Sequence, residues 1–423
     1  MPNSASTIDD LRPTTPVLLV WPAVPAWRIR GQLWLDRKFK DGMDTWCDQW
    51  PGCIRAVMEV AQLKEVPSFG AYRWSGVDER FDLAVLEPGE AFSARHLEGV
   101  DLLMSSADNP GKLVAPDLCR RAGVACIMAI EYTLSTRLDM LAHSRVGALK
   151  RLKTVAWFLM NERRIRSALR RCDAVQANGI PAYDAYARAR PGNLLYFDTR
   201  LAAQAVITAD ALQARLDTLQ AGRPLRLAFS GRLIGGKGAD ALVPLAARLR
   251  KRGLDFRFDI YGDGELKQEI AAGIHGEGLQ QLVTLHGPID FATQLMPRLK
   301  ESVDLFVCCH RQGDPSCTYA ETLGCGVPIV GFANESLGSL VDAYGVGWAT
   351  PMNALDPLAD VIVRLDRDRA DIAAKSRAAR DFGTTHSFET TFRQRIDHGV
   401  DVLARRGAAR GGDRSQVAAT DAA

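Results

Sequence analysis

The chain has 423 residues, a length that suits two domains better than one. Its hydrophobic content of 47% and charged content of 24% are those of a globular protein, and its net charge of +3 argues against a general nucleic-acid partner. No uncharged apolar run reaches the length of a membrane span, and the polar N-terminus carries no secretory signal pattern. The cysteines form no C-x-x-C pair, which favours reduced thiols and a cytoplasmic location.

Short apolar runs alternate with helical stretches through the first half of the chain, a pattern typical of a parallel sheet covered by helices. Strands are predicted at 17–21, 82–86, 101–105, 124–130, 173–176 and 194–197. Helices are predicted at 116–122, 146–171 and 208–219. The pattern changes around 193–222, where we place the domain junction, and a turn that contains Gly222 and Pro224 follows the last of these helices.

The second half repeats this alternation more regularly and predicts a second doubly wound domain. Its strands are expected at 225–230, 256–261, 282–285, 305–309 and 329–332, with helices at 240–252, 264–272, 292–300 and 320–324. The predicted fold class is therefore α/β with two Rossmann-like domains. We expect these domains at 16–205 and 206–404, with disordered ends at 1–15 and 405–423.

The segment 145–171 is strongly basic, with nine Lys or Arg residues against the single acid Glu162. Apolar residues, among them Trp157 and Met160, lie between the basic ones. A basic amphipathic face could contact anionic lipid or a lipid-linked acceptor. A domain helix with its cations in water would have the same sequence pattern, and both interpretations stay open.

A glycine-rich turn, FSGRLIGGKG at 229–238, follows the first strand of the second half. Glycines such as Gly231 allow the backbone to approach an anion, and the following helix adds partial positive charge. Arg232 and Lys237 offer a planar fork and a point charge that suit a diphosphate. The alternative is a plain turn with two solvated cations.

A second segment, GDPSCTYAETLGCGVP at 313–328, follows the strand that ends near residue 309. In an open α/β sheet this carboxyl end of a strand is where ligands bind. The segment provides an acid in the loop, Asp314, and another early in a helix, Glu321. Backbone N–H groups at Ser316, Cys317 and Thr318 would favour an anion. Alternatively, Asp314 forms a turn and Glu321 lies in solvent.

Together these segments resemble the C-terminal domain of glycosyltransferase family 4, a family of retaining enzymes with the GT-B fold. YGDG at 261–264 and HG at 286–287 complete the ordered set. The resemblance implies that Arg232 and Lys237 hold the diphosphate of a nucleotide-sugar donor and that Glu321 binds its ribose. It also implies two domains facing a cleft, with the acceptor held by the first.

The chain departs from the family pattern at two places. The first acid of the family, which contacts the transferred sugar, is replaced by Gly313, and we expect the shorter Asp314 to substitute for it. After the next strand, Glu335 lies in a stretch where family members commonly carry paired glycines, so its side chain could alter the pocket or fill it.

In the first half, Glu131 ends a strand and could bind acceptor or sugar, although a structural carboxylate is an equal alternative.

The resemblance implies a retaining, metal-independent glycosyltransferase of the hexosyl type, acting in envelope or exopolysaccharide synthesis. UDP-, GDP- and ADP-sugars all fit as donors, and no further cofactor is expected. The acceptor would be a saccharide or a lipid-linked saccharide, and the cytoplasmic enzyme could bind the inner membrane face through 145–171. The histidines do not cluster with acids or cysteines, so no metal site is expected. A sugar-nucleotide epimerase on this scaffold and a catalytically silent nucleotide-sugar-binding protein remain alternatives.

Overall fold

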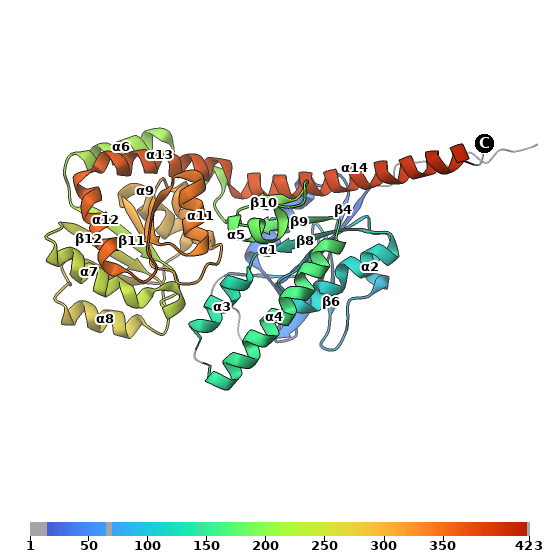
Figure 1. The fold of residues 1–423 in the computed structure, drawn as a ribbon, viewed down its shortest axis with the longest axis horizontal. Coiled ribbons are helices and arrows are strands. Elements are labelled where there is room, and N and C mark those ends of the chain that lie inside the picture. The colour runs from blue at the N-terminus through green and yellow to red at the C-terminus, as the bar shows by residue number, and fades with distance from the viewer. Residues whose placement is uncertain (1–14, 65–69, 145, 421–423) are drawn as a thin grey trace, which may run out of the picture. The chain divides into compact units, whose positions relative to one another are not determined.

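The computed structural model describes residues 15–64, 70–144 and 146–420 (Figure 1). Its contacts define two compact units. The first consists of Met1–Ser106, Val114–Ile127 and Gly399–Ala423, and the second of Ala107–Leu113 and Met128–His398. The predicted disordered segment 1–15 lies almost wholly outside the described residues.

The first unit is built on a parallel sheet in which β1 lies between β4 and β7, and β4 also pairs with β6. β2 extends this sheet parallel to β4, and β3 and β5 follow in antiparallel pairing. The strands are β1 (Val17–Trp21), β2 (Ala26–Ile29), β3 (Gln32–Asp36), β4 (Cys53–Gln62), β5 (Ala71–Arg73), β6 (Asp82–Leu86) and β7 (Leu102–Ser106). The helices are α1 (Arg37–Gln49), η1 (Ala94–Leu97) and α2 (Ala115–Ala122).

The second unit begins with short elements around the 9-residue helix α3 and the 24-residue helix α4. α3 and α4 are joined through Arg137, which forms ion pairs with Asp108 (3.0 Å) and Glu162 (3.4 Å). β9 and β10 pair in parallel. The elements here are η2 (Pro110–Val114), α3 (Leu134–Ala142), α4 (Ala148–Arg171), β9 (Ala174–Asn178), α5 (Ile180–Ala182), η3 (Tyr183–Ala187), β10 (Leu194–Tyr196), η4 (Ala203–Ala205) and α6 (Ala209–Gln220). The strand β8 (Ala125–Ile130) begins in the first unit and enters the second at Met128.

A six-stranded, all-parallel sheet in the order β13-β12-β11-β14-β15-β16 forms the rest of the second unit. Its strands are β11 (Leu225–Ser230), β12 (Phe256–Tyr261), β13 (Val283–Gly287), β14 (Leu305–Cys308), β15 (Ile329–Phe332) and β16 (Gly347–Thr350). Its helices and turns are η5 (Gly235–Lys237), η6 (Ala239–Ala241), α7 (Leu242–Lys251), α8 (Lys267–Gly276), η7 (Phe291–Leu295), α9 (Met296–Ser302), α10 (Cys317–Gly324), α11 (Glu335–Tyr344), α12 (Leu355–Arg367) and α13 (Arg369–Thr385). The last helix, α14 (Phe388–Thr420), begins in the second unit, and from Gly399 onwards it belongs to the first.

Two apolar cores cover the two faces of this sheet, because successive side chains of a strand point to opposite faces. On β11, Leu227 and Phe229 belong to the core beneath α7, α8 and α12, whereas Ala228 belongs to the core beneath α9, α10 and α11. Both faces are thus apolar, as expected for a buried parallel sheet.

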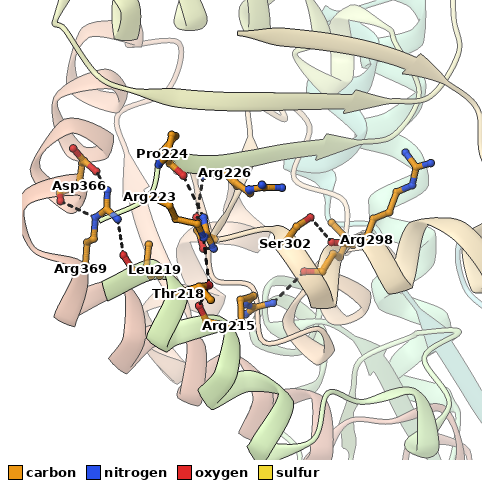
Figure 2. Close-up of polar contacts among 12 residues, drawn as sticks. Arg215, Thr218, Leu219, Arg223, Pro224, Arg226, Arg298, Ser302, Asp366 and Arg369 are labelled. Carbon is orange, nitrogen blue, oxygen red and sulfur yellow. Dashed lines mark hydrogen bonds and ion pairs between the residues drawn. The ribbon is translucent and has the colours of Figure 1, made fainter. Parts of the chain in front are cut away.

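Arginines fix the helix that precedes this sheet (Figure 2). The buried Arg215 of α6 donates to the carbonyl oxygens of Leu299 and Cys325, both at 3.0 Å. Burial lowers the pKa of Arg215 to about 10. Arg223 forms a bidentate ion pair with the buried Asp304 at 2.7 and 2.8 Å. These contacts, together with the hydrogen bond from the N–H of Arg226 to Asp304 at 2.9 Å, tie the start of β11 to the residue that precedes β14.

The tail predicted as disordered from residue 405 is helical as far as Thr420, because α14 continues without a break. Alanine and arginine are frequent there and are strong helix formers. Arg406 also donates to the carbonyl oxygen of Val124 at 2.7 Å, which anchors this end of the helix. Among the described residues, no helix is both long and apolar enough to cross a bilayer.

Candidate functional site

Two loops meet where the adjacent strands β11 and β14 end. These strands pair in parallel, so the loops that follow them leave the same edge of the sheet. Gly238 makes the approach possible: its φ is +66°, and a Cβ there would lie only 1.8 Å from the carbonyl oxygen of Cys309. No other residue type fits this position, and the contact places the turn 231–238 against the loop that begins at residue 309.

The two loops are joined by an ion pair between Lys237 and Asp314. Lys237 Nζ lies 2.8 and 3.1 Å from the two carboxylate oxygens of Asp314, and Lys237 is only 6% exposed. Gln312 Nε2 donates to the same carboxylate at 2.9 Å. The two predicted site residues Lys237 and Asp314 are therefore in contact, and the carboxylate of Asp314 balances the charge of Lys237.

Arg232 is exposed, and its guanidinium has no hydrogen-bond or ion-pair partner among the described residues. Gly231 donates its N–H to the carbonyl oxygen of Tyr261 at 3.1 Å and is half-buried. Arg232 thus adds a cation at this edge of the sheet that forms no ion pair with any acid in the described part of the chain, and it can neutralise an external anion.

The start of α10 differs in part from the prediction. The backbone N–H of Ser316 donates to the carbonyl oxygen of Asp314 at 2.8 Å, so this donor is already used within the loop. Cys317 Sγ lies 3.7 Å from an oxygen of Asp198, and Thr318 is half-buried. Cys317 and Thr318 remain in the first turn of the helix, where backbone N–H groups lack carbonyl partners within the helix.

Glu321 lies one turn into α10 and is 4% exposed, so it is not the solvated residue of the alternative interpretation. Arg200 holds it, with Nε 2.9 Å from Oε1 and Nη2 3.3 Å from Oε2. The guanidinium of Arg200 also lies over the ring of Phe291, 4.3 Å from its centroid. Arg200 was missed in the sequence because it lies far along the chain from both motifs.

Glu335 is the first residue of α11, and its carboxylate lies beside Gly313. Thr133 donates its hydroxyl to Glu335 Oε2 at 2.9 Å, and the hydroxyl of Thr136 lies 3.5 Å from the same oxygen. A Cβ built on Gly313 would lie 3.4 Å from that oxygen. Thr133, which caps the N-terminus of α3, thus fixes one carboxylate oxygen of Glu335 next to the loop that carries Asp314.

Glu131 and Tyr132 directly follow β8 and are positioned by Asp108, which accepts hydrogen bonds from their backbone N–H groups at 2.8 and 3.1 Å. Burial, together with the nearby carboxylates of Glu131 and Asp314, raises the pKa of Tyr132. Glu131 is half-buried and therefore partly structural. Tyr132 is nevertheless close enough to both Glu131 and Asp314 for their charges to act on it.

A buried polar cluster supports the loop from below. His310 is 1% exposed, and its Nδ1 lies 3.4 Å from the hydroxyl of Tyr319. Burial, followed by the charge of Lys237, holds the pKa of His310 well below its usual value, so the ring is neutral. Asn334 donates to the carbonyl oxygen of His310 at 3.1 Å and caps α11 by accepting from the N–H groups of Ser336 and Leu337. None of these supporting contacts was inferred from the sequence.

A small pocket lies beside this loop, lined by Gly179, Pro315, Ser316 and Ser336 among others. Within the described part of the chain, no three His, Cys, Asp or Glu side chains gather in a way that could hold a metal ion.

Comparison with known proteins identifies related sequences. Residues 224–368 match the family model described as "Glycosyl transferases group 1". The amylovoran biosynthesis glycosyltransferase AmsK of Erwinia amylovora is 27% identical over 187 residues, which are 41% of this chain and 42% of AmsK. The 2-deoxystreptamine glucosyltransferase of Streptomyces kanamyceticus is 25% identical over 291 residues, 65% of this chain and 71% of that protein. The chain therefore matches less than half the length of AmsK.

Solved structures share the fold at low identity. Anabaena HepE in complex with UDP has a TM-score of 0.63 at 14% identity, covering 91% of this chain and 99% of HepE. A glycosyltransferase from Rickettsia africae has a TM-score of 0.60 at 11% identity, with 93% and 99% covered. These likenesses confirm the predicted fold class, α/β of the GT-B type with two Rossmann-like parts.

Proposed function

We propose that this chain, in which residues 224–368 are a glycosyl transferases group 1 domain, is a retaining glycosyltransferase that uses a nucleotide-diphosphate sugar. The observation that carries the proposal is the junction of the two loops at the ends of β11 and β14, which places Lys237 next to the acidic loop at 313–314. Arg232 adds an unbalanced cation at the same edge. A diphosphate there would meet two cations without any metal ion.

In the proposed reaction, the bond between the anomeric carbon and the β-phosphate oxygen breaks, and the acceptor hydroxyl oxygen bonds to that carbon. Negative charge grows on the departing nucleoside diphosphate, whose β-phosphate oxygen takes up the proton that the acceptor hydroxyl loses. Arg232 and Lys237 stabilise this charge, which lowers the barrier because they are already in place. Glu321 accepts hydrogen bonds from the ribose hydroxyls and shares its carboxylate with Arg200.

The relatives support a choice of donor and acceptor classes to test. HepE structures contain UDP and, in another crystal, UDP-glucose, so UDP-sugars are the first donors to test. AmsK is named for amylovoran biosynthesis, and another relative, from Salmonella typhimurium, is named as a putative colanic acid biosynthesis glycosyltransferase. We infer a hexosyl donor and a saccharide or lipid-linked saccharide acceptor. We also propose 16–205 as the acceptor domain and 206–404 as the donor domain.

We further propose that α4 contacts an anionic lipid surface. Leu149, Leu152 and Met160 are 68%, 67% and 60% exposed and lie on one side of the helix. Lys150 and Lys153 lie between them and would meet lipid phosphates. Apolar side chains in contact with acyl chains, beside cations at the head groups, are the arrangement of an interfacial helix.

Sedimentation with vesicles tests this contact. The chain should sediment with phosphatidylglycerol vesicles and not with phosphatidylcholine vesicles, and Leu152→Glu should abolish the binding. Val77→Glu is the matched control, because Val77 is also an exposed apolar residue, at 69%. Equal binding of the two variants would contradict the proposal.

Calorimetric titration of UDP, GDP and ADP in EDTA tests the donor site. One nucleotide should bind the wild type and be lost or strongly weakened in Arg232→Ala. With a sugar donor, Arg232→Ala and Lys237→Ala should each lower turnover by about 100-fold or more. Wild-type rates in both variants would contradict the assignment, and product analysis separates transfer from the epimerase alternative. Binding without nucleotide release would instead support a silent binding protein.

A further inference from the structure

We propose that Glu335, and neither residue 313 nor Asp314, supplies the carboxylate that binds the transferred sugar. This inference rests on the proposed function, because it concerns the group attached to the donor diphosphate. The sugar is bonded directly to that diphosphate, so it must lie close to the cation that holds the phosphates. The acids near Lys237 are therefore the candidates for binding sugar hydroxyl groups.

Asp314 is poorly suited to this role because both of its oxygens are already in use. Lys237 Nζ binds them at 2.8 and 3.1 Å, and Gln312 Nε2 binds Oδ1 at 2.9 Å. The side chains of Lys237 and Asp314 are 8% and 16% exposed. To bind a sugar, Asp314 would have to release a nearly buried ammonium group. Asp314 is thus a residue that positions Lys237.

Gly313 leaves an open space that the carboxylate of Glu335 enters. A Cβ on Gly313 would lie 3.1 Å from the Cβ of Glu335 and 3.4 Å from its Oε2. The backbone at Gly313 does not need glycine, since its φ lies outside the left-handed range. The missing side chain therefore serves the packing of Glu335, which brings an acid from α11 to the point where a side chain at 313 would begin.

The carboxylate of Glu335 is both fixed and available. Thr133 and Thr136 hold Oε2 at 2.9 and 3.5 Å, whereas Oε1 has no partner among the described residues, and the residue is exposed. Its position at the start of α11 suits a carboxylate, because the helix N-terminus favours negative charge. A fixed carboxylate with one free oxygen is well suited to accept a hydrogen bond from a sugar hydroxyl.

A different explanation is that Glu335 only stabilises the N-terminus of α11. In that case, loss of its charge would lower the melting temperature without changing sugar recognition. The two explanations are separated by the ratio of two affinities, that for the nucleotide sugar and that for the free nucleotide. Only a residue that touches the sugar changes this ratio.

The experiment uses the full chain and the nucleotide, among UDP, GDP and ADP, that binds the wild type. Dissociation constants for the free nucleotide and its glucose, galactose, N-acetylglucosamine and mannose derivatives are compared in wild type, Glu335→Gln and Glu301→Gln. Glu301 is an exposed acid on α9 and serves as the matched control. Glu335→Gln should reduce the preference for the best sugar nucleotide by about 10- to 100-fold, with free-nucleotide affinity changed less than about threefold.

A relocated carboxylate provides the second test. Gly313→Glu combined with Glu335→Gly removes the crowding Cβ and returns an acid to the loop, so part of the sugar preference should return. Unchanged sugar preference in Glu335→Gln, with the free nucleotide still bound, would overturn the inference and leave the proposed function standing. A wild type that binds none of the nucleotides would instead overturn the proposed function, and the inference with it.

Discussion

The ion pair between Lys237 and Asp314 predicts two opposite effects of Asp314→Asn. The substitution leaves a nearly buried ammonium group without its counter-charge, and breaking a buried pair in this way costs roughly 3 kcal/mol or more. For a domain of this size, we expect the melting temperature to fall by about 6–12 °C. Nucleotide binding should become stronger, because an acid that repels the diphosphate has been removed.

The size of the gain in affinity follows from Coulomb's law. One phosphate charge about 8 Å from Asp314, at an effective dielectric constant near 20, meets a repulsion on the order of 2 kcal/mol. After screening by salt, we expect the nucleotide to bind about tenfold more tightly, with a stronger dependence on ionic strength. Calorimetric titrations at low and high salt measure both effects.

Two results would refute this reasoning. If nucleotide affinity and melting temperature were both unchanged, the ion pair would not control Lys237. If only the affinity for the sugar nucleotide fell, Asp314 would touch the sugar, as the sequence alone suggested. Asp366→Asn is the control, because Asp366 pairs with Arg369 away from the two loops.

Other residues give further predictions. Gly238→Ala should prevent correct folding, because its Cβ would clash with the carbonyl oxygen of Cys309, whereas Gly235→Ala has open space and should behave as wild type in circular dichroism. Glu321→Gln should weaken binding of the ribonucleotide by about tenfold and remove its preference over the 2′-deoxy form in titrations. Burial lowers the pKa of His386 to about 4, so stability should fall as the pH drops from about 6.5 towards 4, where the unfolded chain takes up a proton that the folded chain does not. Between pH 7 and 5, the free energy of unfolding should fall by about 2 kcal/mol because of His386. In His386→Phe, thermal unfolding should show a correspondingly smaller loss of stability over the same pH range. An equal loss in the wild type and the variant would contradict this prediction.

Much of the second half could be predicted because each of its strands is a compact apolar run between turn residues. The bounds of β11, β12 and β15 agree with the prediction. β4 was missed because charged residues such as Arg55 and Glu59 interrupt its apolar pattern. β16 was missed because its four residues, GWAT, give almost no signal.

The sequence predicted the parts of the site that lie within a single motif, and it did not predict the contacts between distant positions. The motifs indicated Lys237 and Asp314 separately, but that they bind each other depends on two loops folding together. Arg200 is paired with Glu321 across 121 positions of sequence. Thr133 contacts Glu335 from an even more distant part of the chain. Such contacts are made by tertiary packing and leave no local pattern.

The contact between Gly313 and Glu335 has an evolutionary consequence. One small volume of the protein is shared by two positions that lie on different elements, and only one of them can fill it with an acid. During evolution, the acid can therefore move from one of these positions to the other. The intermediate sequence, which has an acid at neither position, need not persist for long. Homologous chains should carry a long side chain at one position and a small one at the other, so a substitution at either site is expected to be followed by its counterpart.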